Sequence, residues 1–259
     1  MNIQSTKKVL LELTSSCNLN CQHCFYRQNI NFQSNNFLNK KKAFDLIDKF
    51  KNNNICNLVL TGGEPALHPN FIEIAKYAKK NIPRVTLCTN GLIENKKLRD
   101  KIIELNFDTY TLSIDSHINS VHDKFRGKKG SLKSVINFTK QLKNNKREIS
   151  IHITLHLNNL DHIEKTIKYC KQFNCEIVVS SIYYDKLDCN DKIKENYYEK
   201  IDKFKNKYIK DRDIILVGFN EYCNNNNCLD QKKVFTVNRK GELVSCYWQK
   251  NGGKFIKKY

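Results

Sequence analysis

CNLNCQHC, at residues 17–24, organises the chain, because it places three thiols directly after the apolar run at residues 9–13. The thiols belong to Cys17, Cys21 and Cys24. Three neighbouring thiolates can hold three irons of a four-iron cluster and leave the fourth iron open to another ligand. A structural zinc site needs four ligands, so zinc would require a remote fourth residue here. The stretch is therefore a candidate metal centre whose ligand set is incomplete.

Composition limits the kind of protein that carries this stretch. The 259 residues and their 40% hydrophobic share suffice for one large domain, with or without a small appendage. Eleven cysteines without a signal peptide indicate reduced thiols and metal ligands of a cytoplasmic protein. No apolar run approaches the length of a membrane span, so we expect no membrane partner.

The formal net charge of +19 comes from lysines that are spread along the whole chain among asparagine and isoleucine. No nucleic-acid motif accompanies them, so we interpret the charge as a solvated basic surface and expect no nucleic-acid partner. Such a surface would still favour an anionic substrate or an acidic reductant protein.

Apolar runs and helical periodicities alternate along most of the chain. They predict strands at residues 9–14, 58–60, 84–88, 109–114, 149–155 and 176–182. They predict helices at residues 39–51, 70–80, 95–105, 131–143 and 160–172. This alternation indicates an α/β protein with a parallel sheet and helical crossovers. About six such units fit before Asp185, fewer than the eight of a closed TIM barrel.

Polar residues gather at the carboxyl ends of the predicted strands, where parallel barrels carry their chemistry. Gly62-Gly63-Glu64-Pro65 follows the second strand. Its two glycines allow close backbone approach, Glu64 adds an acceptor, and Pro65 stiffens the turn. Ser113-Ile114-Asp115 closes the fourth strand with a hydroxyl and a carboxylate on one face. Either segment alone is an ordinary turn, but together with the thiol stretch they predict one shared site.

The spacing Cys-x3-Cys-x2-Cys and the Gly-Gly-Glu-Pro segment together resemble the radical S-adenosylmethionine (SAM) superfamily. The resemblance covers residues 9 to about 185 and implies an open, partial (β/α)6 TIM-like barrel. It implies that Cys17, Cys21 and Cys24 bind a [4Fe-4S] cluster whose open iron is chelated by SAM. In this family an electron from the cluster cleaves SAM to a 5′-deoxyadenosyl radical, which abstracts a hydrogen atom from the substrate. A flavodoxin or ferredoxin would supply the electron.

The resemblance also assigns side chains to SAM. The Gly-Gly-Glu-Pro segment would bind its amino group, and Arg126, within the segment at residues 122–127, would bind its carboxylate as a bidentate partner. His23 and Tyr26 would lie near the adenine, and the end of the fourth strand would meet the ribose or the carboxylate. The expected SAM contacts are His23, Tyr26, Gly62, Gly63, Glu64, Pro65, Asn90, Ser113, Asp115, Arg126 and Thr154.

The pattern changes after residue 185, so we expect a core at residues 1–185 and a linker helix with a small hairpin cap at residues 186–259. The spacing of Cys228, Gly241 and Cys246 resembles the opening of the SPASM and twitch extensions of radical SAM enzymes, which hold auxiliary [4Fe-4S] clusters. The later cysteines of those extensions are missing after Cys246, which suggests a truncated version.

Three interpretations of these cap cysteines stay open. Cys223, Cys228 and Cys246 could hold a second iron–sulfur cluster with an open iron, could have lost the metal, or could bind zinc with a further residue such as Cys189. The remaining cysteines are interpreted as core residues, namely Cys56, Cys88, Cys170 and Cys175.

Three functions compete. A radical SAM enzyme that modifies a peptide is favoured by the SPASM-like cap and by residues 122–127. A radical SAM enzyme that oxidises or epimerises a small anionic metabolite, such as a sugar or nucleotide, is favoured by the short tail and by the absence of a leader-binding domain before Val9. The third is a non-catalytic zinc or iron–sulfur protein, such as a sensor.

Overall fold

The strands and helices follow one another in the expected alternation. The computed structural model describes residues 8–24, 36–181, 191–217, 234–244 and 255–258. The first half of the described chain contains β1 (Lys8–Thr14), α1 (Lys40–Asn52), β2 (Asn57–Gly62), the 3-10 helix η1 (Pro65–Leu67), α2 (Phe71–Asn81), β3 (Arg84–Thr89), α3 (Lys96–Glu104), β4 (Thr109–Ser113) and α4 (Asn119–Arg126). The second half contains α5 (Ser131–Asn144), β5 (Ile149–Leu155), α6 (Leu157–Leu160), α7 (Ile163–Lys171), β6 (Glu176–Ser181), α8 (Asp191–Tyr208), β7 (Ile214–Val217), β8 (Val234–Val237), β9 (Glu242–Val244) and β10 (Phe255–Lys258).

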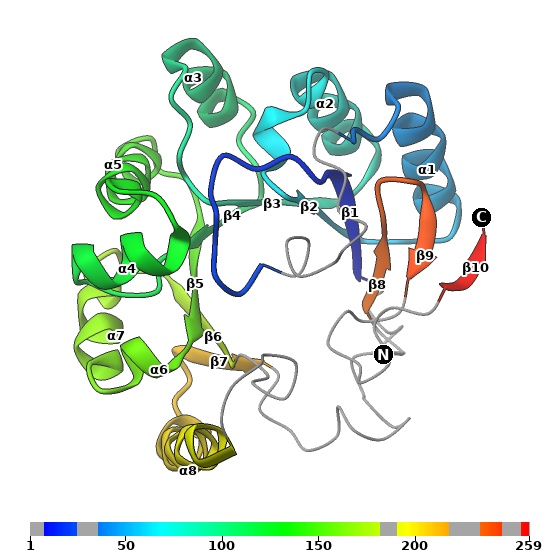
Figure 1. The fold of residues 1–259 in the computed structure, drawn as a ribbon. Coiled ribbons are helices and arrows are strands. Elements are labelled where there is room, and N and C mark those ends of the chain that lie inside the picture. Colours follow the sequence, from blue (N-terminus) through cyan, green and yellow to red (C-terminus); the bar gives the residue numbers. More distant parts are fainter. Residues whose placement is uncertain (1–7, 25–35, 182–190, 218–233, 245–254, 259) are drawn as a thin grey trace.

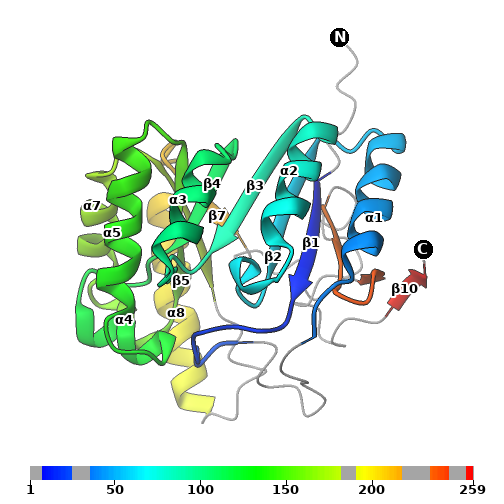
Figure 2. The ribbon, with the colours of Figure 1, turned by 90° about the horizontal axis from the view of Figure 1, so that it is seen from above.

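All ten described strands form one curled sheet in the order β10-β9-β8-β1-β2-β3-β4-β5-β6-β7. The eight strands from β8 to β7 are parallel, and β9 and β10 each pair antiparallel with the preceding strand. Helices cover the outer side of the curl (Figures 1 and 2). The predicted partial TIM-like barrel is therefore confirmed, with two parallel strands beyond the six expected ones.

The central strands present an apolar row to the helices and a polar row to the inside of the curl. In β3, Val85 and Leu87 are fully buried in the core, whereas Thr86 and Cys88 on the opposite face are half-buried. β4 repeats this alternation. Burial of each large apolar side chain contributes about 1.5–3 kcal/mol, so the helix-facing row stabilises the fold while the inner row stays free to meet a ligand.

Two short α-helices of the structure were not predicted, and one predicted helix begins later than expected. α4 occupies residues 119–126, where we expected only a functional segment. The helix expected at residues 160–172 is α7, which begins at Ile163, and the unpredicted α6 lies before it. The break between α6 and α7 follows Leu160, and the backbone N–H of His162 there bonds the carbonyl of Asn159 at 3.2 Å.

The predicted hairpin is confirmed and extends the sheet. β8 and β9 are joined by a turn in which the N–H of Gly241 bonds the carbonyl of Asn238 at 2.7 Å, and Gly241 has a φ of 74°. β8 lies parallel to β1, with Lys8 in register with Val234. The expected boundary at residue 185 lies outside the described residues.

α8 closes the described helical layer at the β7 edge of the sheet. Its Tyr197 is fully buried and donates a hydrogen bond to the carbonyl of Leu155 at 3.0 Å, whereas Ile193 near its start is 43% exposed. None of the helices in the described ranges is long and apolar enough to cross a lipid bilayer.

Candidate cofactor-binding site

The thiol stretch directly follows β1 and is fastened on one side by the double-glycine turn after β2. Gly63 donates its backbone N–H to the carbonyl of Thr14 at 2.7 Å, and Glu64 donates to the carbonyl of Ser16 at 2.7 Å. A Cβ atom on Gly62 would lie 2.3 Å from the Thr14 oxygen, and one on Gly63 would lie 2.2 Å from the Ser16 oxygen. The two glycines therefore make room for the backbone that leads into the thiol stretch, and the expected close approach of a ligand to them stays a prediction.

The end of α4 fastens the same stretch on its other side. Asn20 donates its N–H to the carbonyl of Arg126 at 3.1 Å, and Gln22 donates to the carbonyl of Phe125 at 2.9 Å. Gly127 ends the helix with a φ of 69°, and a Cβ there would lie 2.1 Å from the Asn20 oxygen. The stretch is thus clamped between two elements that come from different strand ends.

The three predicted ligands are half-buried and lie close enough to affect one another. Burial raises the pKa of Cys17 to about 11, and neighbouring charges, including the thiolates of Cys21 and Cys24, add to the increase. Burial also raises the pKa of Cys21. A metal overcomes this preference for the thiol because it binds the deprotonated form directly. The donor set therefore suits a metal that brings compensating positive charge.

The arrangement does not resemble a mononuclear metal site. Within the described ranges, no three His, Cys, Asp or Glu side chains converge tightly enough to hold a single ion. A cluster distributes its thiolates over separate irons, so it does not require such convergence. The chemistry of the donor set, three thiolates that can each bind a separate iron, is compatible with an iron–sulfur cluster.

Glu64 is buried at the end of β2 and binds the end of β3. Its Oε1 accepts hydrogen bonds from the Thr89 hydroxyl at 2.9 Å and the Ala66 N–H at 3.2 Å, and its Oε2 accepts from the Asn90 N–H at 2.8 Å. Burial outweighs these donors and raises the pKa of Glu64 to about 7. A cationic group placed beside it would favour the carboxylate.

This pKa makes the stability of the cluster-free protein depend on pH. Unfolded Glu titrates near 4.3, so between pH ~4.5 and ~7 folded Glu64 holds a proton that the unfolded chain has released. The contribution of Glu64 to the free energy of unfolding is therefore expected to fall by about 3 kcal/mol across this window and to level off above it. Glu64→Gln should remove this component. Urea unfolding of both proteins from pH 5 to pH 8 measures it, and parallel stability curves would contradict the assignment.

Asp115 and Arg126 form a buried ion pair at the end of β4. Arg126 donates to both carboxylate oxygens of Asp115, from Nε at 2.5 Å and from Nη2 at 3.0 Å. The backbone N–H of Thr154 adds a third hydrogen bond to Asp115 at 2.9 Å. The Arg126 charge and these bonds overcome the effect of burial and hold the pKa of Asp115 well below its usual range.

The pair changes the roles expected of these residues. We expected Arg126 to bind the SAM carboxylate as a bidentate partner, but in the structure its bidentate partner is Asp115. Its remaining nitrogen, Nη1, lies 3.9 Å from the Sγ of Cys21. Thr154 reaches the site through its backbone. Direct contacts of these residues with SAM stay predictions.

Asn90 joins the end of β3 to the thiol stretch. Its Nδ2 donates to Asn18 Oδ1 at 2.8 Å and lies 3.7 Å from the Sγ of Cys17. Asn18 in turn donates a hydrogen bond from its own Nδ2 to the carbonyl of Leu92 at 2.7 Å. The expectation that Asn90 belongs to the site is consistent with this contact, although no sequence pattern indicated Asn18 as its partner.

Three stacked rings form a wall beside the thiols. The His23 ring stacks on Phe125 with centroids 4.6 Å apart, and Phe125 stacks on His156 at 3.6 Å. Burial lowers the pKa of His23 to about 3 and that of His156 to about 4, so both imidazoles are neutral near pH 7. Sequence reasoning found His23 but missed Phe125 and His156, whose proximity depends on how α4 packs.

The other expected site residues fall into two groups. Pro65 is buried and begins η1, and Ser113 ends β4 on the inner face, in register with His152 of β5. Tyr26, Cys223, Cys228 and Cys246 lie outside the described residues.

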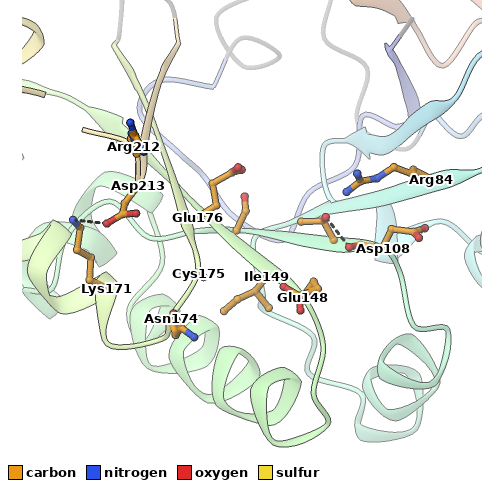
Figure 3. Close-up of a pocket in the computed structure, with 12 residues that line it drawn as sticks. Arg84, Asp108, Glu148, Ile149, Lys171, Asn174, Cys175, Glu176, Arg212 and Asp213 are labelled. Carbon is orange, nitrogen blue, oxygen red and sulfur yellow. Dashed lines mark hydrogen bonds and ion pairs between the residues drawn. The ribbon is translucent and has the colours of Figure 1, made fainter. Parts of the chain in front are cut away.

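A separate cavity of about 590 Å³ opens at the amino-terminal strand ends, on the edge opposite the thiols (Figure 3). Its rim carries charged side chains of both signs, with Arg84 and Asp108 on one side and Arg212 and Asp213 on the other. Lys171 and Asp213 at this rim form an ion pair at 3.3 Å. Parallel barrels carry their chemistry at the other edge, so the cavity is not part of the candidate site.

The sequence was compared with models of known protein families, and one family matches. The model of the family described as "Radical SAM superfamily" matches residues 11–170. The chain belongs to the radical SAM superfamily. Enzymes of this superfamily use a [4Fe-4S] cluster and SAM.

Radical SAM relatives with different names share the matched region. The chain is 31% identical over 161 residues to an AdoMet-dependent heme synthase of Methanosarcina barkeri, covering 62% of this chain and 46% of that protein. It is 26% identical over 160 residues to the sporulation killing factor maturation protein SkfB of Bacillus subtilis, covering 62% and 38%. The matches thus span less than half of either relative's length.

A solved radical SAM structure has the same fold. Streptococcus suis SuiB bound to precursor peptide SuiA aligns with a TM-score of 0.72 at 13% identity, covering 97% of this chain and 63% of that one. At this identity the likeness concerns the fold alone.

Proposed function

We propose that this protein is a radical SAM enzyme in which Cys17, Cys21 and Cys24 bind the [4Fe-4S] cluster. The observation that carries the proposal is the clamping of the thiol stretch between the double-glycine turn and the end of α4. One clamp follows the carboxyl end of β2, and the other ends the helix that follows β4. Three thiols on a fixed backbone are an incomplete ligand set that SAM would complete.

The chain's own residues would hold SAM and keep its surroundings dry. The turn that contains Glu64 offers a buried carboxylate to the amino group, whose positive charge would favour the ionised form. The neutral ring of His23 offers a flat apolar face for the adenine. The other proposed SAM contacts are Tyr26, Gly62, Gly63, Pro65, Asn90, Ser113, Asp115, Arg126 and Thr154. When bound, the cluster and SAM supply a 5′-deoxyadenosyl radical that abstracts a hydrogen atom from the substrate.

A peptide is the proposed substrate. The name of SkfB as a maturation protein and the precursor peptide in the SuiB structure support this class. A small anionic metabolite is the second candidate, supported by the name of the heme synthase relative. The half-buried hydroxyl of Thr86 and its neighbours on the inner face of the curl favour a substrate with hydrogen-bonding groups in either case.

Two further parts of the proposal concern partners and the second part of the chain. A flavodoxin or ferredoxin would act as reductant, supported by the net charge of +19, because these carriers are acidic. Residues 186–259 would act as a cap on the core, in which Cys223, Cys228 and Cys246 hold a second cluster or have lost it.

Anaerobic reconstitution of the full chain tests the function. With iron, sulfide, SAM and dithionite, the protein should form a brown [4Fe-4S] species and release 5′-deoxyadenosine, even without substrate. A sample without dithionite is the control and should release none. A non-catalytic zinc or iron–sulfur protein would bind metal but leave SAM intact, and that result would refute the proposal.

A further inference from the structure

Two side chains outside the cysteine motif direct N–H groups at cysteine sulfurs. Asn90 Nδ2 lies 3.7 Å from Cys17 Sγ, and Arg126 Nη1 lies 3.9 Å from Cys21 Sγ. Both distances suit long N–H to sulfur hydrogen bonds. The two contacts fall on different cysteines and come from different elements, the end of β3 and the end of α4, so they are independent of each other.

The Arg126 contact is fixed by the rest of the guanidinium. Asp115 accepts from Nε and Nη2, which leaves Nη1 as the nitrogen that faces Cys21. A planar guanidinium held at one edge by a carboxylate cannot turn its other nitrogen away. The Arg126 residue is only 6% exposed, so water screens its charge weakly.

The Asn90 contact is fixed in the same way. Its Oδ1 accepts the Leu92 N–H at 2.8 Å, which determines the orientation of the amide. One amide proton is then used by Asn18 Oδ1 at 2.8 Å, and the second is available to Cys17. The Asn90 amide and the Arg126 guanidinium can therefore both reach a cysteine sulfur without rearranging.

We propose that Arg126 and Asn90 are positioning residues that donate hydrogen bonds to the sulfurs of cluster ligands and raise the reduction potential of the cluster. The inference rests on the proposed function, because it takes Cys17 and Cys21 as ligands. Hydrogen bonds to ligand sulfurs are one of the features that set cluster potentials. Donors and positive charge near sulfur stabilise the reduced cluster more than the oxidised one, because reduction adds negative charge. Arg126 thus acts on the metal centre through the Cys21 sulfur, a role separate from its proposed contact with SAM.

A redox titration of the anaerobically reconstituted full chain tests this. The midpoint potential, followed by the electron paramagnetic resonance of the reduced cluster without SAM, is compared for wild type, Arg126→Gln and Asn90→Ala. Both variants should shift to more negative potentials, and the double variant should shift by about the sum, because the contacts are on separate sulfurs. Lys124→Gln is the matched control, since it removes the same charge from an exposed position of α4. It should leave the potential unchanged.

The possible outcomes separate the two proposals. If both variants have the same midpoint potential as wild type, this inference is overturned and the proposed enzymatic function stands. An equal shift in Lys124→Gln also overturns it, because general charge would then be the cause. If Arg126→Gln fails to load iron, the potential of Asn90→Ala decides alone. A wild-type protein that forms no cluster overturns the proposed function and this inference together.

Discussion

Cys24→Ala is expected to abolish both the visible absorbance of the iron–sulfur cluster and the cleavage of SAM. Two thiolates cannot hold a four-iron cluster in the open-iron form, because a second iron would lose its protein ligand. Cys24 follows a tight turn in which its N–H bonds the carbonyl of Cys21 at 3.2 Å, and Cys17 and Cys21 are the only other described cysteines in this stretch. Iron analysis, the visible spectrum and the yield of 5′-deoxyadenosine measure the effect.

Cys56→Ala is the matched control for this experiment. Cys56 is half-buried, as Cys24 is, but it precedes β2 at the opposite edge of the sheet. Its variant should keep the absorbance and the cleavage of wild type. Retained cleavage in Cys24→Ala would contradict the ligand assignment and the function built on it.

Asp115→Asn is expected to cost about 3–5 kcal/mol of unfolding free energy in the cluster-free protein. The substitution keeps the size of the side chain but leaves the buried Arg126 guanidinium without its counter-charge. A buried charge that loses its partner pays its full desolvation cost. Urea unfolding followed by circular dichroism measures the loss.

A double variant and a surface control sharpen this prediction. Asp115→Asn combined with Arg126→Met should lose less stability than Asp115→Asn alone, because the unpaired charge is then absent. Asp161→Asn removes an exposed ion pair with Lys200, whose two side chains are 76% and 40% exposed. Its effect should stay below about 1 kcal/mol. Equal losses for Asp115→Asn and Asp161→Asn would contradict the energetic role of the buried pair.

The sequence could predict the sheet because each strand carries its own signal. Runs such as Leu58-Val59-Leu60 are short, apolar and bounded by turn residues, and the helices between them have regular apolar spacing. The last parallel strands, β7 and β8, could be predicted as strands but not as neighbours of β6 and β1. Their positions depend on pairing over a long sequence separation, which local patterns do not encode.

α4 could not be predicted from apolar spacing because its buried face is largely polar. The helix buries the side chains of His122, Phe125 and Arg126, and two of these three side chains carry polar nitrogen atoms. Packing of α4 then decides the roles of Arg126 and Phe125 in the site. Resemblance to the family gave the right segment, but the partner of Arg126 required the three-dimensional arrangement.

The contacts of Asn90 could not be predicted from local sequence patterns either. Asn18 and Cys17 lie more than seventy residues before it, and only the closeness of the β3 end to the thiol stretch joins them. The double-glycine turn was predicted as a site element, yet its glycines contact protein backbone. A glycine pair in a sequence indicates close approach but does not say what approaches.

The parallel pairing of β8 with β1 has a consequence for biosynthesis. Lys8 precedes Val234, its register partner, by more than two hundred residues, so the ribosome makes it much earlier. The β8-facing edge of β1 therefore stays unpaired until that later strand has been made, and unpaired edges recruit foreign strands. Newly made chains should depend on chaperones until this late strand arrives, and overexpression at low temperature should give more usable protein than rapid synthesis.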